Sequence, residues 1–273
     1  MLECAAHAAV DSARVVTSDV ARFWTVFDTA RVDDLTASVE AGYLDAGTPA
    51  LRDYAARVGK AFDFAIDIYR RRARYEAARA ATLRAAESAP AIRAEFRKLK
   101  SLYPDAVLPD VYFVIGRFSL GGAALAHGVV VGAELYPDPA RLSVIVAHEA
   151  VHCQQPRATP DQTLLERAFS EGSADFVGEM ISGSTIDEPA QAYGRAHEHE
   201  LWAEFKPHAH EPTYYPWMYG KPPGDRPNDL GYFIGYRIAR AYYERAKDKR
   251  RAVADIIRMR DVDEILRLSG YDP

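Results

Sequence analysis

The sequence predicts a mainly helical α+β fold with a small β-sheet. Apolar side chains recur with helical periodicity from about residue 18 to residue 102. The chain then changes to short β-branched and aromatic runs, and returns to two long apolar helical segments. We therefore expect an N-terminal helical part over residues 1–103 and a second part, which holds the sheet, over residues 104–273. We expect these parts to form one compact unit.

The N-terminal part is expected to bury two apolar faces. Phe23, Trp24 and Phe27 share one face of a helix. A near-heptad stripe on a later, longer helix predicts a second set of core positions. Its members are Leu51, Tyr54, Val58, Phe62, Ala65 and Tyr69. Pro104 and Pro109 then mark a break in the helical pattern.

Two short runs at 111–115 and 129–131 predict β-strands, because β-branched and aromatic residues favour a pleated, half-buried backbone. The connection between them is rich in glycine and is too long for a tight hairpin. Its glycines are Gly116, Gly121, Gly122 and Gly128. We expect the two strands to form an antiparallel pair.

The next segment predicts a buried helix. Asp138 and Pro139 have the N-cap and first-turn pattern, the residues that follow are apolar nearly all round, and Pro156 ends the segment. This helix carries the string His148-Glu149-Ala150-Val151-His152.

His148 and His152 are candidate metal ligands, because positions i and i+4 lie on one face of a helix and can direct two imidazoles at one ion. Glu149 then lies beside the ion without binding it. Ionisable side chains in so apolar a helix are costly to bury without partners, and a metal ion would supply one. The alternative is that the histidines cap or pack a buried helix and the glutamate is solvated.

A second helix is expected to begin at Thr159, where a capping-box pattern starts, and to end near Gly183. Glu171 and Asp175 share one face of it with small and apolar neighbours. Gly172 weakens a helix interior, which predicts that another backbone passes close by. The alternative is an ordinary amphipathic helix that carries a pair of carboxylates.

Together these residues resemble the thermolysin-like gluzincin zinc metallopeptidases. That family has an HExxH string followed on a second helix by ExxxD, and here Glu171 follows His152 by 19 positions, with Asp175 one turn beyond. Metzincins need a glycine and a third histidine soon after the string, and this pattern is absent after Cys153.

The resemblance implies a zincin-like core and a role for each motif residue. His148, His152 and Glu171 would bind one zinc ion per chain. Glu149 would be the general base, and Asp175 would orient a ligand histidine, His148.

More narrowly, the chain resembles the uncharacterised bacterial zinc-dependent proteases that are related to a gliding-motility lipoprotein. Four stretches carry this resemblance and span nearly the whole chain. They are residues 16–24, residues 47–51, the motif region, and residues 231–237. The resemblance implies a reaction class and says almost nothing about the substrate.

A substrate-binding strand is also implied. In thermolysin-like enzymes a strand edge beside the active-site helix pairs with an extended substrate. Gly121, Gly122 and Ala123 are the candidates for this edge, by resemblance and because an exposed strand edge can accept a peptide strand.

Hydrolysis needs a donor for the negative charge that develops on the carbonyl oxygen. Tyr236 is the first candidate and Tyr232 the second, since they lie one turn apart on a helix with a glycine face. The alternative is that both are ordinary core tyrosines. The Pro- and Gly-rich segment 207–227 is too long for a simple turn, and we expect it to fold over the site.

Composition narrows the class of protein. With 273 residues, 48% of them hydrophobic, the chain can bury a full core, and its net charge of −5 gives no sign of nucleic-acid binding. Cys4 and Cys153 are too few for a disulfide framework. The N-terminus shows no signal peptide and the chain no membrane-spanning run, so we expect a soluble protein, exported or periplasmic if its N-terminus was trimmed. Its compartment stays unknown.

We therefore expect zinc-dependent hydrolysis of a peptide bond in a peptide or protein substrate, by a metal-activated water with Glu149 as general base. One alternative is a metal amidohydrolase that does not cleave peptides. The other is a catalytically silent zinc-binding interaction protein, against which Glu149 argues because a structural site needs no base.

Overall fold

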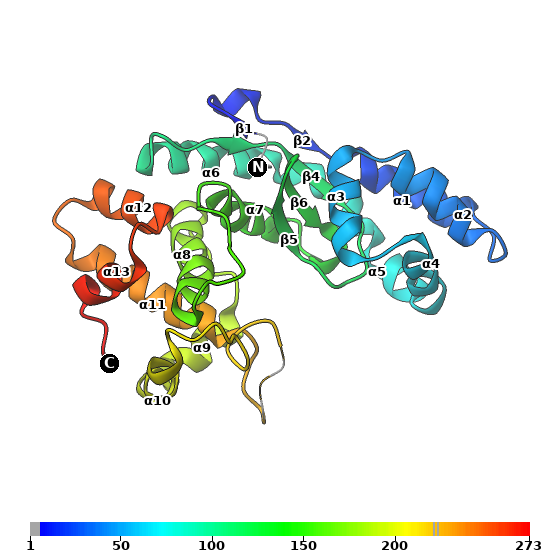
Figure 1. Cartoon of the computed structure of the whole chain (residues 1–273). Coiled ribbons are helices and arrows are strands. Elements are labelled where there is room, and N and C mark those ends of the chain that lie inside the picture. The colour runs from blue at the N-terminus through cyan, green and yellow to red at the C-terminus, as the bar shows by residue number, and fades with distance from the viewer. Residues whose placement is uncertain (1–5, 221, 223) are drawn as a thin grey trace. The chain divides into compact units, whose positions relative to one another are not determined.

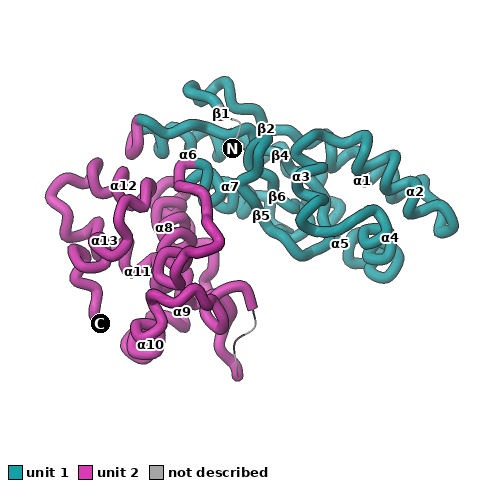
Figure 2. Tube along the Cα trace, in the orientation of Figure 1, with its two compact units in different colours: residues 1–100, 105–153 teal, residues 101–104, 154–273 magenta. Residues whose placement is uncertain are grey.

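The computed structural model describes residues 6–220, 222 and 224–273, and Figure 1 labels most of its elements. The chain divides into two compact units, which Figure 2 colours separately. Unit 1 comprises Met1–Lys100 and Asp105–Cys153, and unit 2 comprises Ser101–Pro104 and Gln154–Pro273. Helices predominate and the sheet is small, so the mainly helical α+β class is confirmed. The expected division into residues 1–103 and 104–273 stays a prediction.

Unit 1 holds the described strands and the first group of helices. Its helices are η1 (Val10–Ser12), α1 (Ser18–Thr29), α2 (Leu35–Val39), the π-helix η2 (Glu40–Asp45), α3 (Pro49–Val58), α4 (Ala61–Arg70), α5 (Arg72–Leu83), η3 (Ala85–Ser88), most of α6 (Ala89–Leu102), η4 (Ala133–Leu135) and α7 (Ala140–His152). Its strands are β1 (Ala6–His7), β2 (Val15–Val16), β3 (Leu108–Pro109), β4 (Val111–Val114), β5 (Gly122–Leu125) and β6 (Gly128–Gly132).

The regular elements that the structure describes in unit 2 are all helices. Its elements are α8 (Leu164–Ser182), α9 (Glu188–Ala196), α10 (Glu198–Phe205), η5 (Lys206–His208), α11 (Leu230–Arg245), α12 (Lys249–Arg258) and α13 (Val262–Ser269). In both units together, no described helix is both long enough and apolar enough to cross a membrane.

The main sheet is mixed, with strand order β2-β4-β6-β5, and β1 and β3 form a separate antiparallel pair. β4 runs parallel to β2 and to β6, whereas β5 is antiparallel to β6. The predicted antiparallel pairing of 111–115 with 129–131 is therefore wrong. The connection between them contains a strand of its own, β5, which reverses the chain so that β6 runs in the direction of β4.

Helices cover both faces of the sheet at β5 and β6. Gly122 is paired with Val131, so both point to one face, and Gly132 points to the other. A Cβ atom at Gly122 would meet Ile145 of α7, and one at Gly132 would meet Tyr54 of α3. α7 and α3 therefore pack against opposite faces.

Buried tyrosines fix the path of the chain between β4 and β5. The hydroxyls of Tyr43, Tyr54 and Tyr75 donate to backbone carbonyls within residues 115–120, at 2.7 to 2.9 Å. Because buried backbone carbonyls need partners, these bonds hold an otherwise irregular segment in one conformation. They thereby determine where β5 begins.

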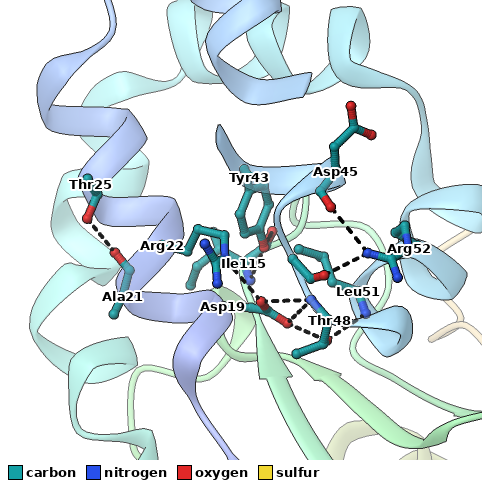
Figure 3. Close-up of polar contacts among 11 residues, drawn as sticks. Asp19, Ala21, Arg22, Thr25, Tyr43, Asp45, Thr48, Leu51, Arg52 and Ile115 are labelled. Atoms are coloured by element: carbon teal, nitrogen blue, oxygen red, sulfur yellow. Dashed lines mark hydrogen bonds and ion pairs between the residues drawn. The ribbon is translucent and has the colours of Figure 1, made fainter. Parts of the chain in front are cut away.

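A buried carboxylate joins the first turns of α1 and α3 (Figure 3). Asp19, which is 1% exposed, accepts hydrogen bonds from the backbone N–H of Thr48 at 3.1 Å and from its hydroxyl at 2.5 Å. The same hydroxyl accepts from the N–H of Leu51 and caps α3. Asp19 and Thr48 come from two of the four stretches that carry the narrower resemblance, so those stretches meet in unit 1.

The apolar stripe predicted for one long helix lies on two. α3 and α4 are separated at Gly59, whose φ of 140° is a conformation that favours glycine. Phe62 and Tyr69 are 61% and 65% exposed, so their assignment to the core is wrong. The break changes the direction of the chain, and α4 turns a different face to the core.

In unit 2, α8 and α11 cross at backbone contact. A Cβ atom at Gly172 would collide with the backbone of α11 at Tyr236, and one at Gly235 would collide with the backbone of α8 at Ala168. The prediction that Gly172 lets another backbone approach is confirmed.

The predicted start of the second helix at Thr159 is wrong, because the helix is capped by the next capping box along the chain. α8 begins after Thr163, whose hydroxyl accepts the N–H of Glu166 at 3.2 Å, while Glu166 accepts the N–H of Thr163 at 2.7 Å. Thr159 lies in the preceding turn. The reciprocal pair at Thr163 satisfies two N–H groups at once and therefore fixes the boundary.

Candidate metal centre

The helix that carries the histidine motif is positioned by its own sequence. α7 begins at Ala140, and Asp138 accepts the Ala140 N–H at 2.9 Å. From Leu142 to Val151 every residue is buried, so the helix is fixed by packing on all sides. It ends at His152, four residues before Pro156, where the prediction placed its limit.

The two motif histidines converge. Their Nε2 atoms lie 2.9 Å apart, and the rings meet edge to face with centroids 4.6 Å apart. His148 is 8% exposed and His152 is half-buried. Two imidazole nitrogens directed at one point from successive turns are the arrangement in which a helix presents a pair of ligands to one metal ion.

Glu149 lies between these histidines in sequence and is 8% exposed. It faces β5, where a Cβ atom at Gly122 would lie 2.8 Å from its Oε1 and 3.0 Å from its Cγ. A glycine at this position therefore leaves the space that the carboxylate occupies. Within unit 1, the candidate base and the candidate substrate-binding strand are in contact.

Tyr136 is a neighbour of this group that sequence reasoning missed. Burial raises the pKa of its phenol, and the charge of Glu149 raises it further. A Cβ atom at Gly121 would contact the Tyr136 hydroxyl. The phenol is therefore a neutral donor at physiological pH beside Gly121. No local motif marks it, because it follows the short helix η4 and reaches this place only through the fold of unit 1.

In unit 2, Glu171 is buried on α8, and two side chains contact one of its carboxylate oxygens. The hydroxyl of Tyr219 donates to Oε1 at 2.9 Å, and Nη2 of Arg167 lies 3.0 Å from the same atom. Nε of Arg167 also donates to the Tyr219 hydroxyl. Loss of solvation around its phenol, followed by the charge of Glu171, raises the pKa of Tyr219, so the phenol stays protonated and donates.

Tyr219 and Arg167 were also missed from the sequence. Arg167 precedes Glu171 by four residues, and this helical spacing is a signal that could have indicated an ion pair. Tyr219 has no such signal beyond its place in segment 207–227.

The two candidate donors on α11 have different surroundings. Tyr232 is half-buried, and loss of solvation around its phenol, followed by the charge of Glu171, raises its pKa well above the usual value, with Asp175 a smaller contributor. The Tyr236 hydroxyl donates to Glu179 at 3.2 Å. Glu179 lies about two helical turns beyond Glu171 on α8. Within unit 2, the charge of Glu171 therefore acts on Tyr232, whereas the Tyr236 hydroxyl is bonded to Glu179.

Among the described residues, His148, His152 and Glu171 form a group that could hold a metal ion. The donor set fits zinc, which binds imidazole nitrogen and carboxylate oxygen and commonly keeps three protein ligands at catalytic sites. The arrangement thus indicates a metal-binding protein.

The chain belongs to the family described as "Predicted Zn-dependent protease (DUF2268)", whose model matches residues 117–265, more than half of the sequence. This range includes the histidine motif, Glu171 and both α11 tyrosines. Neither the comparison with curated proteins nor that with solved structures returned a match.

Proposed function

We propose that this protein is a zinc metallopeptidase of the thermolysin-like gluzincin type, with a zincin-like core and one zinc ion per chain. The observation that carries the proposal is the convergence of the His148 and His152 Nε2 atoms on α7, beside the buried carboxylate of Glu149. Glu171 is the third ligand. The family description supports zinc dependence and proteolysis. The closer relation to proteases akin to a gliding-motility lipoprotein rests on the four sequence stretches.

Bound zinc would supply Lewis acidity, which polarises the scissile carbonyl and acidifies a water molecule. Glu149 accepts the proton of the attacking water and passes it to the leaving amine. The contact of Glu149 with Gly122 supports this role, because the carboxylate is held beside the strand proposed to bind substrate. Asp175 orients His148.

The substrate is an extended peptide that adds to β5. This strand ends the described sheet, and its one described neighbour is β6, so its other edge can offer backbone N–H and C=O groups. Gly121, Gly122 and Ala123 form the binding segment. This edge favours a peptide over the small amides of a metal amidohydrolase.

The donor to the developing oxyanion is Tyr236 or Tyr232. The effect of the Glu171 charge on the Tyr232 phenol supports Tyr232, and the hydroxyl of Tyr236 is already engaged by its hydrogen bond to Glu179. Comparison of Tyr232→Phe with Tyr236→Phe identifies the donor. Loss of the oxyanion donor should lower kcat by about 10²- to 10³-fold with little change in KM.

Metal content and turnover test the proposal together. Protein purified without added metal should contain close to one equivalent of zinc, and the His148→Ala, His152→Ala double variant should contain none. Glu149→Gln should keep the zinc and lose hydrolysis of a peptide panel by several orders of magnitude, because an amide cannot accept the proton.

Asp175→Asn is the graded control, with a loss of about 10- to 100-fold, since it alters a ligand only through its orientation. Wild-type protein that takes up no zinc, or Glu149→Gln with wild-type turnover, would refute the proposed function. A zinc-loaded protein that cleaves small amides and no peptide would identify the amidohydrolase.

A further inference from the structure

We propose that Tyr219 and Arg167 are positioning residues, which fix the Glu171 carboxylate so that it ligates metal through one defined oxygen. The inference rests on the proposed zinc site and adds to it the device that orients the third ligand. It also assigns a role to the segment 207–227, which supplies Tyr219.

Two hydrogen bonds and one ion pair form a closed triangle that joins Arg167, Tyr219 and one carboxylate oxygen of Glu171. Tyr219 donates its hydroxyl to Oε1 of Glu171 at 2.9 Å, and Nη2 of Arg167 lies 3.0 Å from that atom. Nε of Arg167 donates to the Tyr219 oxygen, which leaves the phenolic hydrogen directed at Glu171. Charge-assisted bonds of this kind are about twice as strong as neutral ones, so the carboxylate is held against rotation.

The backbone at Tyr219 is arranged for this contact. Its φ of 59° is uncommon for a bulky residue, and its N–H is held by Asp229 Oδ1 at 2.8 Å. Such a conformation is unfavourable by itself and persists where the surroundings determine it. Yet Tyr219 is 53% exposed, so burial of its ring in the core does not explain it. The hydrogen bond from the Tyr219 hydroxyl to Glu171 offsets the cost of this backbone conformation.

The consequence for a metal is geometric. A carboxylate whose Oε1 is engaged by two donors presents Oε2 as the ligand atom and pays little ordering entropy when an ion binds. Without Tyr219, the side chain of Glu171 can rotate and share its oxygens between alternative arrangements. Zinc should then bind more weakly, although none of the three ligands has changed.

The test compares Tyr219→Phe with Tyr214→Phe in the full chain. Tyr214 lies in the same segment, packs against the Tyr219 ring with centroids 6.5 Å apart, and donates its hydroxyl to the Gln162 carbonyl instead of to Glu171. Zinc dissociation constants are measured by competition with a chromophoric chelator, and the Tm of each zinc-free protein is measured in parallel. We expect Tyr219→Phe to weaken zinc binding by about 10- to 100-fold and Tyr214→Phe to leave it within about 2-fold.

A Glu171→Ala background separates positioning from stability. There Tyr219→Phe should have no further effect on the remaining zinc affinity, because the group that it acts through is gone. Equal affinities of Tyr219→Phe and Tyr214→Phe, or an undiminished effect in the Glu171→Ala background, would overturn the inference while leaving the zinc site intact. Absence of zinc binding in the wild type would instead refute the proposed function.

Discussion

Glu134 is a carboxylate enclosed within unit 1, 5% exposed and incompletely paired. Its Oε1 accepts the N–H of Phe118 at 3.1 Å, but its Oε2 has no hydrogen-bond partner among the described residues. Burial raises its pKa to about 7, although the backbone amides of Gly116 and Phe118 and the charge of Arg74 act in the opposite direction. It therefore titrates near neutrality.

This residue should make stability depend on pH. The pKa is raised from 4.5 to about 7, so the folded state binds more protons than the unfolded state between these values. Stability should therefore be highest below the unfolded pKa and fall as pH rises to about 7, by an amount on the order of 3 kcal/mol.

Urea unfolding of wild type and Glu134→Gln from pH 5 to 8 isolates this contribution, since other groups titrate in both proteins. The glutamine keeps the acceptor for Phe118, and the variant should gain stability relative to wild type as pH rises. A difference that stays constant with pH would show that Glu134 keeps an ordinary pKa.

At the scale of elements, the contact of β5 with α7 controls the room around the candidate base. A side chain at Gly122 must displace Glu149 or Ile145, because atoms of both lie within 3.0 Å of the position that its Cβ atom would take. Both residues belong to α7, but Ile145 is β-branched and stiff, whereas Glu149 has a longer, unbranched side chain, so the glutamate is the group that can move.

Substitutions at Gly122 should therefore reduce turnover in proportion to size. We expect Gly122→Ala to lower kcat by about 10-fold and Gly122→Val by more, since misplacement of about 1 Å can cost 10²-fold. Zinc content serves as the internal control and should stay at the wild-type value. Full activity in Gly122→Val would show that Glu149 need not occupy the position seen beside β5.

At the scale of the whole molecule, an ion bound by the proposed ligands His148, His152 and Glu171 would stabilise the folded state of the protein. A ligand that binds only the folded protein adds about 2.7 kcal/mol to the free energy of unfolding when its free concentration is 100 times its dissociation constant.

Removal of zinc with a chelator should accordingly lower the Tm, and restoring zinc should reverse the change. Glu149→Gln should show the full shift, because it keeps every ligand, whereas Glu171→Ala should show a reduced one. Scanning calorimetry with and without zinc makes the comparison. A wild-type shift that survives in the His148→Ala, His152→Ala variant would place the responsible ion elsewhere.

The sequence alone determined the features that depend on residues close together in the chain. The convergence of His148 and His152 follows from the rise and twist of any helix, and the close approach at Gly172 follows from a missing side chain. The mainly helical class follows likewise from periodicity that each segment carries within itself.

Contacts between distant residues decided the rest. Thr159 and Thr163 both begin plausible capping boxes, and only the folded chain selects Thr163. The parallel pairing of β4 with β6 depends on β5, which a glycine-rich run did not reveal. Tyr219 reaches Glu171 across 48 positions of sequence. Spacing along the chain fixes neighbours within a few turns, whereas strand pairing, burial and loop contacts depend on how the whole chain packs.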